Sequence, residues 1–342
     1  MMRRLVLAGR PVPAPAVAAV MVLLMLGTGW LLISPGLQPG SRLQQAPTEA
    51  TRQRTGRTTW HRNGSVALQA WRSSLFPRMA KAYTALEAAE YQSEEGRQKE
   101  IVRVEPQGHA RYQLFDPVLG CPRGQGLMRL GSDGDGGKLL CPMEELRSKQ
   151  CLVLSIGSNG QTDFEEAVLK DTPCEVHTFD CTWNGSSIHP DRHTYHKICL
   201  GDRSELRESE HHGPMLFKTL PDIVKMLGYR SIDLLKVDIE GFEYEVVSGW
   251  EFLDSCSFPT QVSMEVHYKG LYIWTGLDNR DTWSPMVWPM HQLSMAELAV
   301  FFGHMADLGY AVVSREDNLP WGEGCCSEFT FIRVEQPAHC RA

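Results

Sequence analysis

The segment IDLLKVDIEGFE, Ile232–Glu243, places charged residues at the carboxyl end of an apolar strand pattern. Lys236 interrupts the apolar run, and Asp238 and Glu240 follow it directly, before Gly241. Such a run, followed by glycine and a helical stretch, predicts a buried parallel strand that ends in a turn. Ligands of open α/β sheets bind at the carboxyl ends of strands, so both carboxylates are candidates for ligand contact or catalysis.

Strand and helix patterns alternate regularly around this segment. The expected strands are 151–156, 175–179, 195–200, 232–237 and 262–266, and the expected helices are 163–170, 219–227 and 294–308. The last two strand patterns, Tyr310–Ser314 and Glu328–Val334, are typical of an antiparallel pair. The alternation predicts an α/β fold with a doubly wound, mostly parallel sheet, right-handed crossovers and an antiparallel C-terminal hairpin.

The first of these strands ends in a glycine-containing loop, Gly157-Ser158-Asn159-Gly160. Such a loop lets a nucleotide-like ligand approach the backbone, although tight turns without a ligand also use glycine. Asp180 ends the second strand, 23 residues after Gly157. That separation is near the spacing of about 20 residues for a carboxylate that accepts hydrogen bonds from ribose hydroxyls. The loop and Asp180 are therefore the predicted cofactor-binding residues.

Asp202 is a further cofactor-binding candidate. It follows the third strand pattern in Leu200-Gly201-Asp202, where it could reach an adenine amino group. Aspartate after glycine is also common in turns, and Asp180–Asn184 has turn character too. Both aspartates thus keep a turn or capping role as an alternative.

The segment Lys236–Glu243 resembles the K-[IV]-D-[IV]-E-G-x-E motif of the FkbM-like methyltransferases. The likeness extends to Leu220–Ile223 upstream and Met264–His267 downstream, and it covers about residues 115–335. The resemblance implies a class I methyltransferase fold, Rossmann-like, with seven strands. It also implies S-adenosylmethionine as the cofactor.

The same resemblance implies roles for single residues. It places the glycine loop and Asp180 at the cofactor, and Asp238 and Glu240 beside the methyl-transfer site. The family's glycine loop usually follows an acidic residue, whereas this chain has Ser155 there. Ser155 motivates the alternative function, a catalytically inactive methyltransferase-like binding or scaffold protein.

Methyl transfer to a hydroxyl is an in-line displacement that needs a base when the oxygen is not ionised. Asp238 or Glu240 is the expected base, because burial and a second carboxylate would raise its pKa toward the useful range. The pair could also hold a divalent cation with Glu265 or His267, or simply cap the following helix. His267 is the third catalytic candidate, and the metal requirement stays open.

Two loops are candidates for covering the site. The connection Tyr268–Trp288 is rich in tyrosine and tryptophan, which would suit a sugar or another flat acceptor, or could form its own aromatic cluster. The segment LMRLGSDGDGGKLLC, Leu127–Cys141, predicts a β-hairpin with a tight turn, or alternatively a cover over the cofactor pocket.

The N-terminal part of the 342-residue chain predicts a targeting segment. Residues 16–34 carry no charge and follow three arginines, which predicts a signal peptide or signal anchor within residues 1–35. The polar residues 36–62 predict a flexible stem, and residues 63–114 a helical extension broken at Pro77. The methyltransferase domain is expected over 115–342.

Cysteines and glycosylation sequons predict the compartment. Ten cysteines and the sequons at Asn63 and Asn184 favour an oxidising, lumenal or extracellular location. The protein would be secreted if the signal is cleaved, and otherwise a single-pass type II membrane protein with a lumenal domain. The adjacent Cys325 and Cys326 are expected to pair with separate partners.

The charge balance limits the partners. Asp and Glu number 41 against 34 Lys and Arg, for a formal charge of −7, which argues against a nucleic-acid partner. The expected acceptor is a small molecule, a glycan or a lipid, and membrane contact is expected only through the N-terminal segment.

Overall fold

The computed structural model describes residues 49–92, 104–134, 136–148, 151–209, 213–268, 292–318 and 325–335. The predicted targeting segment lies outside these residues, as does Tyr268–Trp288 beyond Tyr268 itself. Among the helices in the described ranges, none has the length and apolar character needed to cross a membrane.

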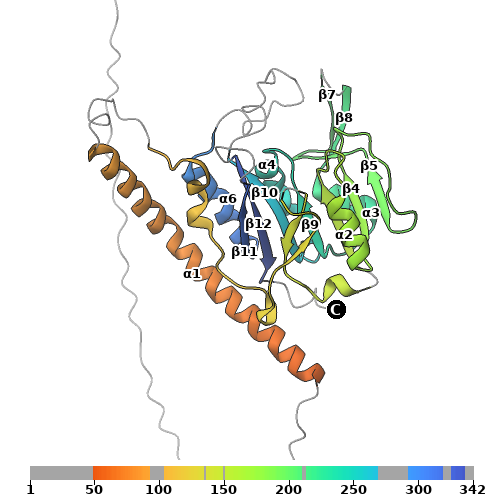
Figure 1. Cartoon of the computed structure of the whole chain (residues 1–342), viewed down its shortest axis with the longest axis horizontal. Coiled ribbons are helices and arrows are strands. Elements are labelled where there is room, and N and C mark those ends of the chain that lie inside the picture. The colour runs from red at the N-terminus through yellow and green to blue at the C-terminus, as the bar shows by residue number, and fades with distance from the viewer. Residues whose placement is uncertain are drawn as a thin grey trace, which may run out of the picture. The chain divides into compact units, whose positions relative to one another are not determined.

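A seven-stranded sheet forms the centre of the fold (Figure 1). In order across the sheet the strands are β11 (Tyr310–Asp317), β12 (Cys326–Arg333), β10 (Gln261–His267), β9 (Leu234–Val237), β3 (Leu152–Ile156), β4 (Glu175–Phe179) and β5 (His193–His196). β12 is antiparallel to both of its neighbours, and the other pairs are parallel. The predicted fold class is therefore confirmed. Strand order reverses between β3 and β9, which is where ligands bind in such sheets.

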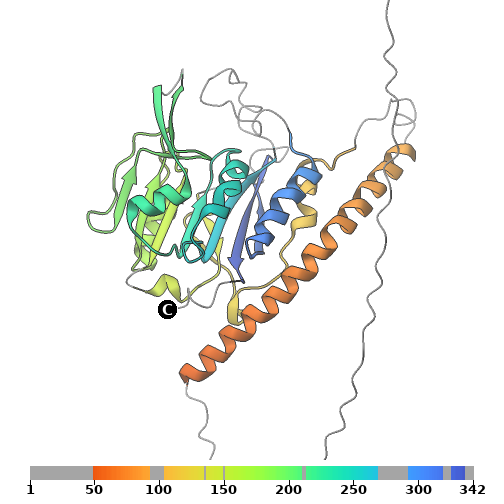
Figure 2. The ribbon, with the colours of Figure 1, turned by 180° about the vertical axis from the view of Figure 1, so that it is seen from behind.

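Helices cover both faces of the sheet, because the central strands are apolar on both sides. Figure 1 shows α2 (Asp163–Asp171) on the near face, and Figure 2 shows α3 (Leu220–Leu227) and α6 (Met295–Asp307) on the opposite face. The short helix α4 (Glu243–Ser248) follows β9. α6 starts with a capping box: the Ser294 hydroxyl accepts from the Glu297 amide at 3.1 Å, and Glu297 accepts from the Ser294 amide at 2.7 Å.

The N-terminal helix α1, Glu49–Gln92, differs from the sequence expectation in two ways. It begins at Glu49, inside the range expected to be a flexible stem, and it continues through Pro77, where a break was expected. Proline removes one backbone hydrogen bond, but a helix held by packing tolerates that loss. Here Leu68, Trp71 and Leu75 are buried in the core shared with the sheet.

Two hairpins lie beside the main sheet. The predicted one pairs β1 (Met128–Leu130) with β2 (Lys138–Leu140), and the Cys121–Cys141 disulfide fastens its end. The second hairpin, β7 (Glu205–Ser209) and β8 (Gly213–Lys218), has no counterpart in the sequence expectations. β8 also pairs with β6 (Cys199–Leu200), so the strand expected over 195–200 is divided between β5 and β6.

Among the disulfides with both cysteines in the described ranges, three join residues that are distant in sequence. They are Cys121–Cys141, Cys151–Cys174 and Cys181–Cys199, with separations of 20, 23 and 18 residues. The fourth joins the neighbours Cys325 and Cys326. The expectation that these two cysteines have separate partners is therefore wrong.

Histidines cluster on β4 and β5 at one edge of the sheet. Nδ1 of His177 lies 2.9 Å from Nε2 of His196, so one ring donates and the other accepts, which requires a neutral ring. His196 also stacks on Phe179, with ring centroids 4.4 Å apart. Burial lowers the pKa of His177 and His193, and burial with both neighbouring histidines lowers the pKa of His196 to about 4.

This cluster predicts a loss of stability in acid. The unfolded chain takes up protons as the pH falls through about 6.5, while folded His196 stays neutral down to about 4, so acid favours unfolding. We expect the free energy of unfolding, measured with urea, to fall by about 1 kcal/mol between pH 7.5 and pH 5 through His196, after allowance for solvent screening. His196→Gln should reduce this pH dependence, and His304→Gln on α6 should retain it. Equal pH dependence in the wild type and His196→Gln would contradict the prediction.

Candidate active site

A cavity of about 390 Å³ opens at the carboxyl ends of β3, β4 and β9, where the strand order reverses. Its polar lining comes from strand ends and from the β1–β2 hairpin: Ser158, Asn159, Asp180, Lys138, Lys236, Asp238, Glu240 and Glu265. Its apolar lining includes Ile156, Phe164, Phe179, Leu200, Phe217, Ile239 and Phe242. The volume and the mixed lining are typical of small-molecule sites.

The glycine loop after β3 is shaped by a close approach to β9. Gly157 has φ +79°, and a Cβ there would lie 1.7 Å from the carbonyl oxygen of Asp238. Gly160 also has φ +79°, and a Cβ there would lie 2.6 Å from the Trp183 ring. Only glycine fits either position. Gly157, Ser158 and Asn159 line the cavity, whereas Gly160 shapes the loop from behind.

Asp180 lines the cavity but already binds several protein donors. One carboxylate oxygen accepts from the amides of Ser158 at 2.9 Å and Asn159 at 2.7 Å. The other accepts from the amide and hydroxyl of Thr182 at 2.8 and 2.7 Å. Burial opposes ionisation, but these hydrogen bonds outweigh it and lower the pKa of Asp180. Asp180 therefore fixes the glycine loop to the end of β4, and a ribose hydroxyl would have to share its oxygens.

Asp202 lies outside the cavity lining. Its carboxylate pairs with Arg203 at 3.0 Å and with Arg207 at 2.7 Å. Leu200, Phe217 and Phe242 do line the cavity. An adenine ring would therefore meet apolar side chains there instead of the Asp202 carboxylate. Phe217 lies on β8 in the unpredicted hairpin, and no sequence pattern indicated that it would reach the site.

Charged side chains from four strands meet beneath Asp238. Glu265 on β10 lies directly opposite Glu328 on β12 in the antiparallel register, a pair that would repel if both carboxylates were ionised. Lys138 on β2 offsets it: its ammonium forms an ion pair with Glu328 and lies 3.4 Å from Asp238. Lys236 lies 3.6 Å from Asp238 and donates to the carbonyl of Gly157.

Two carboxyl groups of this cluster hold one proton between them. Burial raises the pKa of Glu265, and the Asp238 charge raises it further, so Glu265 is protonated and donates a hydrogen bond to Asp238. Burial also opposes ionisation of Asp238, but Lys236 and Lys138 outweigh it and hold the pKa of Asp238 well below its usual range. The expected raised pKa thus belongs to Glu265, and Asp238 is the ionised member.

His267 lies behind the cavity lining rather than on it. Its Nδ1 lies 3.1 Å from Glu243, and its Nε2 lies 3.2 Å from Glu240 and 3.6 Å from Glu265. Burial disfavours the imidazolium, but the Glu243 charge and the hydrogen bonds to Glu240 and Glu243 outweigh it and hold the pKa of His267 well above 6.5. A protonated His267 cannot accept a proton from an acceptor, so it is suited to orient Glu240, which lines the cavity.

Three carboxylates lie close enough to surround a cation. Oxygens of Asp238, Glu265 and Glu328 are all within 4.8 Å of one another. The ammonium of Lys138 contacts two of these groups and supplies the balancing charge itself. Lys138 was not among the predicted site residues, because it lies 100 residues before Asp238 in the segment 127–141, which predicts a hairpin or a cover over the pocket without indicating a role for Lys138.

Removal of the Lys138 charge should destabilise the fold. Lys138→Met leaves Glu328 buried without its cation, and we expect a loss of about 3 kcal/mol in the free energy of unfolding. Glu328→Gln added to Lys138→Met removes the uncompensated charge and should restore at least half of the loss. Urea denaturation of both single variants and the double variant measures the coupling. Additive effects of the two substitutions would contradict the proposed pairing.

The strand order, numbered along the chain within the sheet, is 3-2-1-4-5-7-6 with an antiparallel seventh strand, and the cavity lies at its reversal point. This arrangement defines a class I methyltransferase fold. The model of the family described as a methyltransferase domain matches residues 78–333, and the chain belongs to this family. It therefore carries a class I methyltransferase domain, as the sequence resemblance implied.

Two curated relatives share part of the chain. Human "Probable methyltransferase-like protein 24" is 26% identical over 138 residues, which cover 39% of this chain and 36% of that protein. The rat protein of the same name is 25% identical over 136 residues, with the same coverage. The chain matches about a third of the length of these relatives.

Similar solved structures include two fibrillarins. That of Methanococcus jannaschii has a TM-score of 0.32 and 9% identity, and the match covers 55% of this chain and 69% of that one. That of Aeropyrum pernix, in complex with S-adenosylmethionine, has a TM-score of 0.29 and 10% identity, with coverage of 55% and 68%.

Proposed function

We propose that this methyltransferase is an O-methyltransferase that acts on a hydroxyl of a small molecule, a glycan or a lipid in the secretory pathway or outside the cell. The observation that carries the proposal is the position of Asp238 at the end of β9, where its carboxylate lies 3.4 Å from Lys138 and 3.6 Å from Lys236. Its side chain is 18% exposed, and it lines the cavity beside the glycine loop. A fixed carboxylate at this place can accept a hydrogen bond from an acceptor hydroxyl and orient it.

The cavity fits S-adenosylmethionine, which supplies an electrophilic methyl group when bound. The backbone at Gly157 leaves no room for a side chain, so the loop is open to close approach by a ligand. Leu200, Phe217 and Phe242 would provide apolar surface for adenine, and Asp180 would accept a hydrogen bond from a ribose hydroxyl. Asp238 would supply negative charge for the sulfonium.

The depressed pKa of Asp238 determines when it can act as a base. A weak base does not remove a proton from a neutral alcohol, but it accepts one readily from an oxygen that has become positively charged. Asp238 would therefore orient the hydroxyl first and take its proton as the new carbon–oxygen bond forms. Lys138 and Lys236 keep Asp238 ionised until that moment, and the proton then passes to water.

The compartment is supported by cysteine use and by the two sequons. All nine cysteines among the described residues are disulfide-bonded, which is typical of oxidising compartments. Asn63 and Asn184 are both exposed, as glycan attachment requires. When the chain is made in secretory cells, endoglycosidase treatment should change its electrophoretic mobility, and Asn63→Gln with Asn184→Gln should abolish that change. This result would support the compartment. An unshifted, reduced chain would contradict it.

A catalytically inactive binding protein is the second candidate. It is favoured by the donors that already engage Asp180 and by Ser155, whose buried hydroxyl has no partner among the described residues. Calorimetry on the whole chain distinguishes the two functions. The enzyme is supported if the chain binds S-adenosylhomocysteine and also produces it from S-adenosylmethionine when sugar, lipid or small alcohols are added. The absence of binding would end the enzyme proposal.

A further inference from the structure

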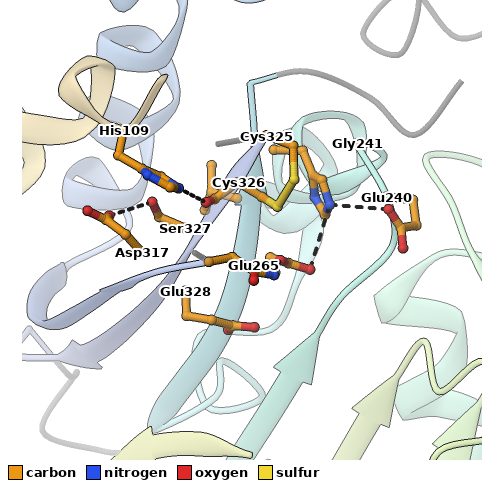
Figure 3. The surroundings of a disulfide bond; sticks show 12 residues. His109, Glu240, Gly241, Glu265, Asp317, Cys325, Cys326, Ser327 and Glu328 are labelled. Atoms are coloured by element: carbon orange, nitrogen blue, oxygen red, sulfur yellow. Dashed lines mark hydrogen bonds and ion pairs between the residues drawn. A yellow bond between two sulfur atoms is a disulfide. The ribbon is translucent and has the colours of Figure 1, made fainter. Parts of the chain in front are cut away.

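The disulfide between Cys325 and Cys326 lies beside His267, behind the cavity lining. Cys326 begins β12 and faces His267 across the antiparallel pair with β10. Cys325 and Cys326 are 8% and 1% exposed. Figure 3 shows Glu240 and Glu265 around the disulfide. The pair is therefore part of the wall behind the catalytic cluster.

This disulfide cannot serve the usual stabilising purpose. A disulfide stabilises a fold mainly by restricting the unfolded chain, and the effect grows with the length of the loop that it closes. The disulfides Cys121–Cys141, Cys151–Cys174 and Cys181–Cys199 have sequence separations of 18 to 23 residues, whereas this one has a separation of 1. It closes no chain loop, so its contribution has to be sought in the folded state.

The two sulfur atoms are close enough to affect His267. They and a ring nitrogen of His267 all lie within 4.8 Å of one another. Hydrogen bonds to both main-chain carbonyls hold the pair in place: the amide of Tyr268 donates to the carbonyl of Cys325 at 2.9 Å, and Nε2 of the His109 ring donates to that of Cys326 at 3.1 Å. A chemical change at the sulfurs therefore acts directly on His267 and, through it, on Glu240 and Glu265.

We propose that Cys325 and Cys326 form a reversible thiol–disulfide exchange site that regulates methyl transfer. Its effect on turnover rests on the proposed function. A dithiol reductant supplies two electrons and two protons: the Cys325–Cys326 bond breaks, two thiols form, and the reductant becomes a disulfide. A disulfide oxidant reverses the step with the same balance.

Reduction changes the charge beside His267. A thiol next to an imidazolium ionises more easily, because the opposite charge stabilises the thiolate. The new anion competes with Glu240 for His267 and adds negative charge next to Glu265. The pair His267 on β10 and Cys326 on β12 is also no longer restrained by the disulfide. The disulfide form is therefore the active one, and reduction should lower turnover about 10-fold, an effect of about 1.4 kcal/mol.

The test uses the whole chain in buffers of graded thiol–disulfide ratio. Differential alkylation and peptide mass spectrometry report the state of each cysteine, and ¹⁵N-histidine NMR reports the His267 ring. We expect Cys325 and Cys326 to open and close reversibly while the chain stays folded, with a shift of the His267 signal and a fall in S-adenosylhomocysteine release. The matched control is Cys325→Ser with Cys326→Ser, which keeps the other disulfides and should lose this redox response.

The outcomes separate this inference from the proposed function. A redox-dependent His267 signal in a chain that binds no S-adenosylhomocysteine would leave the exchange site standing and remove the enzyme proposal. A pair that stays oxidised in every buffer in which the chain is folded would overturn the inference. So would an unchanged redox response in the double variant, or tight zinc binding by the reduced chain through His267 and these cysteines.

Discussion

Asp238→Asn is expected to reduce methyl transfer by about 100-fold to 10,000-fold, the usual range for a lost acid–base group. Asparagine keeps the shape of the side chain but cannot take the proton of the acceptor hydroxyl. Because Asp238 acts only as the carbon–oxygen bond forms, the loss should appear in kcat rather than in KM. S-adenosylhomocysteine release with a panel of sugar, lipid and small alcohols measures it, and calorimetry measures cofactor affinity separately.

A matched control separates this effect from general loss of charge. Asp171→Asn removes an exposed carboxylate at the end of α2 and should leave kcat unchanged. The dissociation constant of S-adenosylhomocysteine should change by less than about threefold in Asp238→Asn, a difference of under 1 kcal/mol. Equal turnover in Asp238→Asn and the wild type would refute the role of Asp238.

Gly157→Ala is expected to cost about 3–5 kcal/mol of folding free energy and to abolish cofactor binding. Its Cβ would lie 1.7 Å from the carbonyl oxygen of Asp238, at a φ of +79° that alanine adopts only under strain. β3 and β9 would have to separate at the point where the cavity forms. Urea denaturation and calorimetry with S-adenosylhomocysteine measure the two effects.

Comparison with Gly228→Ala separates the steric part of this loss from the part due to backbone strain. Gly228 ends α3 with φ +74°, but a Cβ there would meet nothing within 4 Å. Alanine at this position bears only the backbone strain, about 1 kcal/mol, and cofactor affinity should not change. Similar losses for the two alanine variants would show that the contact between Gly157 and Asp238 has little importance.

Much of the fold could be predicted because burial patterns are local. The expected strand 175–179 matches β4, and α2 and α6 end within a residue or two of their expected bounds. The α1 helix shows the limit of this reasoning. A proline predicts a break from local backbone chemistry, whereas packing of Trp71 and Leu75 against the core keeps the helix continuous.

The site residues also divide into those that the sequence could predict and those that it could not. Glycine and aspartate at strand ends can be found in a sequence because parallel strands bring their carboxyl ends to one edge, and both Gly157 and Asp180 line the cavity. Asp202 shows that a strand end alone is insufficient: arginines on its own loop and hairpin bind it, and it does not reach the cavity.

The sequence by itself determined the class of fold, the glycine loop and the Asp238 segment, because each depends on residues within a few positions of one another. Only the tertiary structure decided which carboxylate is ionised. Lys138 meets Asp238 and Glu328 across separations of 100 and 190 residues, and burial with those charges makes Asp238 the anion and Glu265 the acid. Charge interactions depend on distance in space, which residue spacing along the chain does not contain.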